Sequence, residues 1–113
     1  MTRERLPDRR AAETVALEHD GTRFMVMIGF YPDGRPGEVF THGARSGSNM
    51  DALLADACVV MSCLIQHGVE PTELAGSMGR LGNSKPASVI GAVVDLVAAA
   101  STLQQRSAVE AST

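Results

Sequence analysis

The short segment at residues 43–48 combines residue types that bind anions. It reads Gly-Ala-Arg-Ser-Gly-Ser and stands just before a predicted helix. Free backbone N–H groups and the positive end of a helix together favour a phosphate or a carboxylate. The pattern also fits a plain strand-to-helix connection that ends in an N-cap, and it lacks the Gly-Lys-Ser/Thr ending of a P-loop. The candidate anion- or nucleotide-binding site comprises Arg45, Ser46, Gly47 and Ser48.

Cysteine and histidine are the other residues that could bind a metal or attack a substrate. Cys58 and Cys63 fall in one predicted helix. Five positions apart, they point to different faces and should not bond to each other. Neither stands at a helix start or beside a basic cluster, so we expect a core thiol at Cys58 and a half-exposed one at Cys63. The three histidines show no metal-ligand spacing. The sequence predicts no metal site and no catalytic residue.

Alternating apolar residues in the first part of the chain predict three strands that lead to this loop. The strands are expected at residues 14–18, 23–31 and 38–42. Asp20-Gly21 is a strong signal for a two-residue hairpin turn between the first two strands. The second strand is apolar on both faces, with Tyr31 expected beside Met25 and Met27. We therefore expect this strand to be central and covered twice.

Helical periodicity follows and predicts three helices. They are expected at residues 49–67, with Gly68 as the C′ glycine, at 71–78 with Pro71 at the first position, and at about 86–105. The opposite side of the first helix carries small residues, including Ser62, which would let another helix approach closely. The predicted fold is α+β, a three-stranded antiparallel meander followed by three helices packed on the sheet. The expected apolar face of the first helix comprises Met50, Leu53, Leu54, Ala57, Met61, Leu64 and Ile65.

Length and charge are typical of a small globular protein. The chain of 113 residues fits one domain, placed at 13–105 between a charged N-terminal arm (1–12) and a disordered tail (106–113). The arm is either a partly ordered tail or a docking or phosphate-contacting segment. A net charge of −3 argues against nucleic acid as a partner. The N-terminus lacks an apolar signal core, and the apolar stretches are taken as too short for a membrane span, so we expect a cytoplasmic protein.

Several short motifs, in their order and spacing, resemble one known family. They are Leu6-Pro7 with Arg9-Arg10, Asp33-Gly34 with Gly37-Glu38, residues 43–48, and residues 64–73. Together they resemble the C-terminal region of adenosylcobalamin-dependent ribonucleotide reductases, a segment shared with small stand-alone TSCPD proteins. The resemblance covers about residues 3–96. The motif that gives the family its name falls near residues 84–88, where this chain has no cysteine.

The resemblance implies a segment that does not hold the radical chemistry of the reductase. In the family, a cobalamin-generated thiyl radical acts inside a large α/β barrel, and 113 residues cannot form that barrel. We therefore expect no cofactor on this chain, with adenosylcobalamin confined to full-length members. The full enzymes also carry a C-terminal cysteine pair that relays reducing equivalents, whereas no cysteine follows Cys63 here.

Three functional interpretations follow from these observations. The preferred one is a non-catalytic nucleotide-binding, regulatory or assembly module linked to ribonucleoside-diphosphate reduction, with a large reductase chain as a potential partner. The second is a small subunit that contributes to the reductase activity itself. The third is an unrelated protein that binds small anionic ligands through Arg45. Surplus apolar surface predicts a homodimer or larger homo-oligomer, the alternative being a well-filled monomer.

Overall fold

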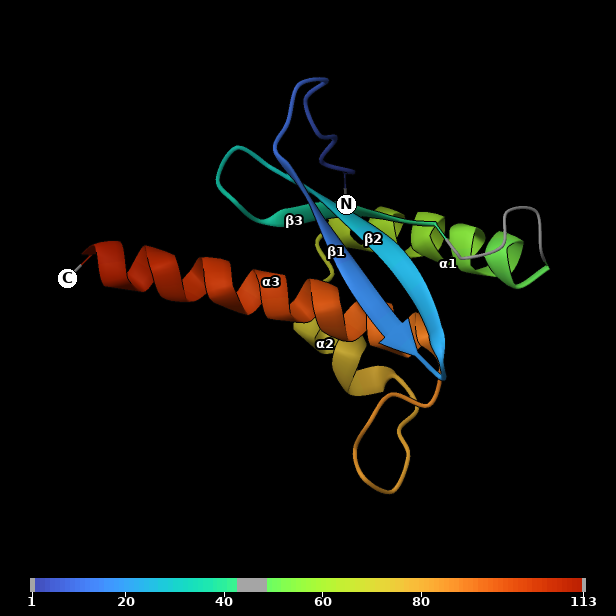
Figure 1. Ribbon diagram of the computed structural model, residues 1–113. Helices are drawn as coiled ribbons and strands as arrows, with labels where there is room; N and C mark the ends of the chain where they lie inside the picture. The colour runs from blue at the N-terminus through green and yellow to red at the C-terminus, as the bar shows by residue number, and fades with distance from the viewer. Residues whose placement is uncertain (1, 43–48, 113) are drawn as a thin grey trace.

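Three strands come first in the chain and three helices follow. The computed structural model describes residues 2–42 and 49–112, with side chains as far as Thr102. The strands form an antiparallel meander in the order β1-β2-β3, and the helices lie against it (Figure 1). The predicted α+β fold is confirmed. The elements are β1 (Ala12–His19), β2 (Thr22–Phe30), β3 (Pro36–His42), α1 (Asn49–Gln66), α2 (Pro71–Ser77) and α3 (Val89–Ser112).

The turn between β1 and β2 follows the chemistry of its two residues. Asp20 and Gly21 have positive φ angles of 52° and 77°, which a type I′ hairpin turn requires. The turn fixes the register that pairs Leu17 with Phe24. Both side chains thereby face the core, because a one-residue slip would send them to the other side of the sheet.

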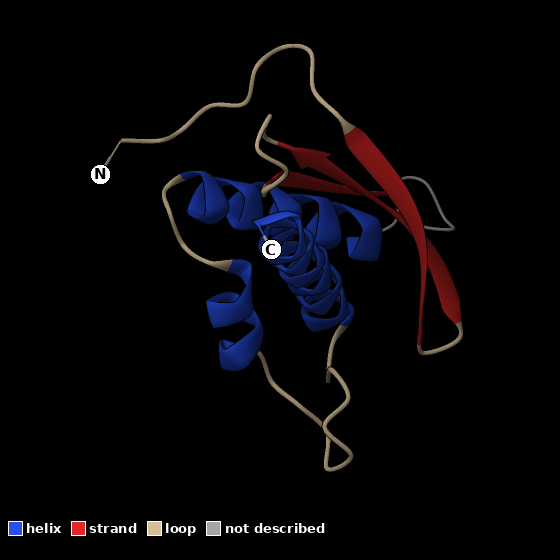
Figure 2. Ribbon diagram, turned by 90° about the vertical axis from the view of Figure 1, so that its left-hand side faces the viewer, coloured by secondary structure: helices blue, strands red, loops and turns tan. Residues whose placement is uncertain are grey.

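The helices cover one face of the sheet and leave the other open (Figure 2). On the open face, Met25, Met27 and Phe40 are 36% to 41% exposed. The prediction that β2 is covered on both faces was therefore wrong, because α1 and α3 pack on the same side of the sheet and α2 packs on α3. The covered face contributes to the core, whose largest fully buried side chains are Ile28, Leu54, Val26, Val39, Val93, Val97 and Cys58.

Tyr31 departs from the alternation expected for β2. The pairing of β2 with β3 shifts register between Gly29 and Phe30, and such an irregularity breaks the period of two. Tyr31 is only 5% exposed, and its hydroxyl donates a hydrogen bond to the Glu4 carbonyl at 2.5 Å. The expectation that Tyr31 lies with the exposed methionines was wrong.

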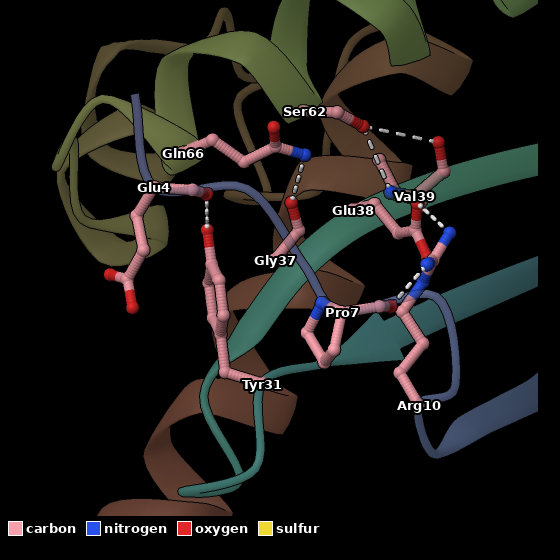
Figure 3. Close-up of polar contacts among 9 residues, drawn as sticks. All are labelled: Glu4, Pro7, Arg10, Tyr31, Gly37, Glu38, Val39, Ser62 and Gln66. Atoms are coloured by element: carbon pink, nitrogen blue, oxygen red, sulfur yellow. Dashed lines mark hydrogen bonds and ion pairs between the residues drawn. The ribbon is translucent and has the colours of Figure 1, made fainter. Parts of the chain in front are cut away.

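Two polar side chains of α1 bind the free edge of β3. The Val39 N–H donates to Ser62 Oγ at 3.0 Å, and Gln66 Nε2 donates to the Gly37 carbonyl at 2.9 Å, as Figure 3 shows. Both side chains are buried. Ser62 therefore faces the sheet, and the prediction that it lies on a side open to another helix was wrong.

The apolar face expected for α1 is only partly used by the core. Leu54, Met61 and Ile65 are buried, whereas Met50 and Leu53 are 56% and 59% exposed. The reason is the rotation of α1 about its axis, which must bring Ser62 and Gln66 to β3. The helix ends as predicted, since Gly68 has a φ of 97°, and the N–H groups of residues 68 and 69 donate to the Ile65 and Leu64 carbonyls in a Schellman motif.

The N-terminal arm docks on the domain. The Glu4 N–H donates to the Gln66 carbonyl at 2.8 Å, and Arg3 Nε donates to Gln66 Oε1 at 2.6 Å. Further along, the Arg10 guanidinium pairs with the Glu38 carboxylate and donates to the Pro7 carbonyl (Figure 3). The arm is thus packed against its own domain, and its role as a docking or phosphate-contacting segment stays a prediction.

The last helix is longer than expected. α3 begins at Val89, where Ser88 Oγ accepts a hydrogen bond from the Gly91 N–H at 3.0 Å, an N-cap. It continues to Ser112, past the predicted end at Gln105 and through the residues assigned to a disordered tail. Ala, Gln, Arg and Glu in this stretch are good helix formers.

By length and composition alone, α1 could cross a membrane. The expectation from the sequence was that the apolar stretches are too short and too interrupted for a span. Core helices pass the same test, and in this fold Leu54, Cys58 and Met61 of α1 are part of the core.

Gly37 stands where a side chain has no room. A Cβ at this position would lie 2.7 Å from the Tyr31 ring and 2.8 Å from Leu6. Gly37→Ala should therefore lower the free energy of unfolding by about 1–3 kcal/mol, measured by urea denaturation. Gly76→Ala is the matched control, because a Cβ there meets nothing within 4 Å. Equal stability of the two variants would contradict the packing of the arm.

Candidate functional site

The loop chosen from the sequence lies outside the described residues. The structure says nothing of Arg45, Ser46, Gly47 or Ser48. The anion site assigned to them therefore stays a prediction.

A pocket of about 770 Å³ opens where three parts of the fold meet. These are the β1–β2 turn, the start of α1 and the start of α3, which lie on the same side of the molecule (Figure 1). Two helices therefore begin at this pocket, and each carries partial positive charge at its first turn. The described lining residues are His19, Asp20, Gly21, Thr22, Arg23, Phe24, Met50, Asp51, Leu53, Leu54, Ala87, Ser88, Val89 and Ile90.

The pocket joins apolar walls to a charged rim. Met50 and Leu53 are more than half exposed, so they offer apolar surface to a ligand. Arg23 supplies a guanidinium beside them, and Asp20 supplies a carboxylate at the turn. Apolar walls with a few charged groups are typical of small-molecule sites.

Part of this wall comes from residues 84–88, near which the resemblance places the motif that gives the family its name. Ala87 and Ser88 line the pocket, at the end of the loop that joins α2 to α3. Arg80 holds this loop, since its guanidinium donates to both Asp95 carboxylate oxygens at 2.6 and 2.7 Å and to the Ala75 carbonyl. The hydrogen bonds from Arg80 hold the pKa of Asp95 below its usual value. The loop is thereby fixed to α3 and α2.

The two cysteines lie away from the pocket, and both are free thiols. Cys58 is 1% exposed and stands 3.7 Å from Thr41 Oγ1. Burial raises the pKa of the Cys58 thiol, and the hydrogen bond to Thr41 opposes this in part. A raised pKa means less thiolate, so Cys58 is a poor nucleophile at neutral pH.

A metal centre was sought among the carboxylates, imidazoles and thiols. Across residues 2–42 and 49–102, no three of these groups come close enough together to hold an ion.

The pocket was not foreseen from the sequence. Its lining comes from three stretches, residues 19–24, 50–54 and 87–90, and no local pattern reveals that they meet. Two local signals were available, because the Asp20-Gly21 turn and the helix start after residue 48 were both recognised. The predicted loop at 43–48 leads directly to Met50 and Asp51 of the lining.

Comparison with known proteins assigns this chain to a family. The TSCPD domain model matches residues 2–104, which is nearly the whole chain. This protein belongs to the TSCPD domain family, as its motifs indicated. No solved structure matches it.

Two relatives have curated names. The chain is 34% identical over 105 residues to the vitamin B12-dependent ribonucleotide reductase of Rhodopirellula baltica, covering 85% of this chain and 10% of the relative. It is 31% identical over 67 residues to the enzyme of the same name from Bradyrhizobium diazoefficiens, covering 59% of this chain and 5% of the relative. The chain thus spans a tenth or less of the length of these relatives.

The difference in burial between the two cysteines predicts a difference in reactivity. In the folded protein, Cys63, which is partly exposed, should be alkylated by iodoacetamide about tenfold or more faster than Cys58. Peptide mass spectrometry reads each site separately. Denaturant should bring the two rates together, and equal rates in the folded protein would contradict the buried position of Cys58.

Proposed function

We propose that this chain is a non-catalytic module, linked to ribonucleotide reduction, that binds a nucleotide in the pocket at the starts of α1 and α3. The pocket is the observation that carries the proposal. Its volume of about 770 Å³ is in the range of small-molecule sites.

The apolar walls and the charged rim of the pocket match the parts of a nucleotide. Met50 and Leu53 offer apolar surface on which a base can lie. Arg23, together with the positive ends of two helices, favours the phosphates. Asp20 can accept hydrogen bonds from sugar hydroxyls. One ligand with an apolar ring, a polar sugar and an anionic end would use all three groups.

The link to ribonucleotide reduction is supported by the family and by two relatives that carry the reductase name. A non-catalytic role is supported by the small part of those relatives that the chain covers. It is also supported by the chemistry of the pocket, since none of its described lining residues is a cysteine. Binding and regulation therefore fit this chain better than the whole reaction.

The test is calorimetric titration with paired ribonucleoside and deoxyribonucleoside diphosphates. At least one of them should bind, and Arg23→Ala should weaken the binding about tenfold or more, because a charge-assisted hydrogen bond is lost. Arg9→Ala is the matched control, since it removes the same charge from an exposed residue that does not line the pocket.

Three results would contradict the proposal. If no nucleotide binds to the folded protein, nucleotide binding is ruled out. If the affinity is unchanged in Arg23→Ala, the nucleotide binds at a site other than this pocket. Equal affinity for pyrophosphate would reduce the pocket to a general anion site, because the base and sugar would then contribute nothing.

A further inference from the structure

Asp20 is held at the rim of the pocket by the hairpin turn to which it belongs. Asp20 and Gly21 both line the pocket, and their φ angles of 52° and 77° are those of a type I′ turn. The flanking strands pair directly from His19 with Thr22 onward. The backbone that carries the carboxylate is therefore fixed before a ligand arrives, and such preorganisation lowers the entropy cost of binding.

The carboxylate of Asp20 has no partner within the described part of the chain. The ion pairs found there are Arg10–Glu38, Arg35–Glu4, Arg35–Asp33 and Arg80–Asp95. Across residues 2–42 and 49–102, neither Asp20 nor Arg23, three positions later, makes an ion pair or a side-chain hydrogen bond. The rim thus carries two opposite charges that do not neutralise each other, and both are available to a ligand.

The other charged groups of the rim decide which end of the pocket suits the phosphates. Asp51 stands in the first turn of α1 and offsets part of the positive charge of that helix end, whereas the first turn of α3 contains no acidic residue. Arg23 and the start of α3 therefore attract phosphates more strongly than the start of α1. His19, also in the lining, adds positive charge only when it is protonated.

A carboxylate at the turn selects hydrogen-bond donors. When ionised it only accepts hydrogen bonds, and it repels phosphates. The donors of a nucleotide are the sugar hydroxyls and, in some bases, the N–H groups at the edge of the ring. The sugar hydroxyls suit Asp20 better, because the apolar surface for the base, Met50 and Leu53, belongs to α1 and not to the turn. With the phosphates at α3 and the base at α1, the sugar is the part that remains for the turn.

We propose that Asp20 gives the pocket a preference for ribonucleotides over 2′-deoxyribonucleotides, by accepting hydrogen bonds from both ribose hydroxyls. The inference rests on the proposed nucleotide pocket and specifies its ligand. Ribose offers one hydroxyl to each carboxylate oxygen, whereas 2′-deoxyribose leaves one oxygen without a partner. Asp20 is exposed, so water can replace the missing hydroxyl. The expected preference is therefore about tenfold, and not the much larger factor of a closed site.

The turn allows Asp20 to be replaced without loss of the hairpin, since Asn-Gly and Gly-Gly form the same type I′ turn. Calorimetric titration of the full chain compares ADP with 2′-deoxy-ADP, and CDP with 2′-deoxy-CDP. The unmodified chain should bind each ribonucleotide about tenfold more tightly than its deoxy form. Asp20→Asn should reduce this ratio, and Asp20→Gly should abolish it. Asp56→Asn is the matched control, because it removes the same charge from an exposed residue outside the pocket lining and should leave the ratio unchanged.

Four outcomes would overturn the inference, and they separate it from the proposed function. Equal affinity for the ribose and deoxyribose forms would end the inference and leave the nucleotide pocket in place. A ratio that is unchanged in Asp20→Gly would assign the discrimination to another group. A preference for one base, lost in Asp20→Gly without any preference for ribose, would place Asp20 at the edge of the base. If no nucleotide binds, the inference and the proposed function fail together. Thermal unfolding of each variant confirms that it is folded before its affinities are compared.

Discussion

The fold depends on how α1 binds the free edge of β3. Gln66 is the centre of this contact, because its side chain donates to the Gly37 carbonyl and accepts from Arg3, while its backbone carbonyl accepts from Glu4. One turn earlier, Ser62 accepts from the Val39 N–H and donates to the Cys58 carbonyl. Buried polar groups must find such partners. An edge strand with unpaired groups would otherwise invite pairing with another chain.

The rotation of α1 that these contacts impose accounts for both the pocket and the exposed apolar side of the helix. With Ser62 and Gln66 turned to the sheet, the apolar face of the helix is divided between the core and the outside. Leu54 and Met61 are then buried, while Met50, Leu53 and Val60 face outward. The same placement sets the start of α1 beside the β1–β2 turn and the start of α3. The pocket and the exposed apolar side of α1 are therefore two consequences of one helix orientation.

Local signals in the sequence predicted the elements, but distant contacts decided their surroundings. The Asp20-Gly21 turn and the Gly68 helix end depend on the conformational freedom of single residues, and both were read correctly. The burial of Tyr31 follows from a register shift and from Glu4, and neither leaves a local pattern. For the same reason the pocket was missed, while the assignment to residues 45–48 falls outside the described part of the chain.

The most direct test of this account is hydrogen exchange of the Val39 amide, followed by NMR. If Ser62 seals the edge of β3, Val39 should be strongly protected, and Ser62→Ala should remove most of that protection while the amides of the central strand β2 keep theirs. Exchange of Val39 at the rate of an exposed amide in the unmodified chain, or full protection in Ser62→Ala, would contradict the claim that α1 is locked to this edge.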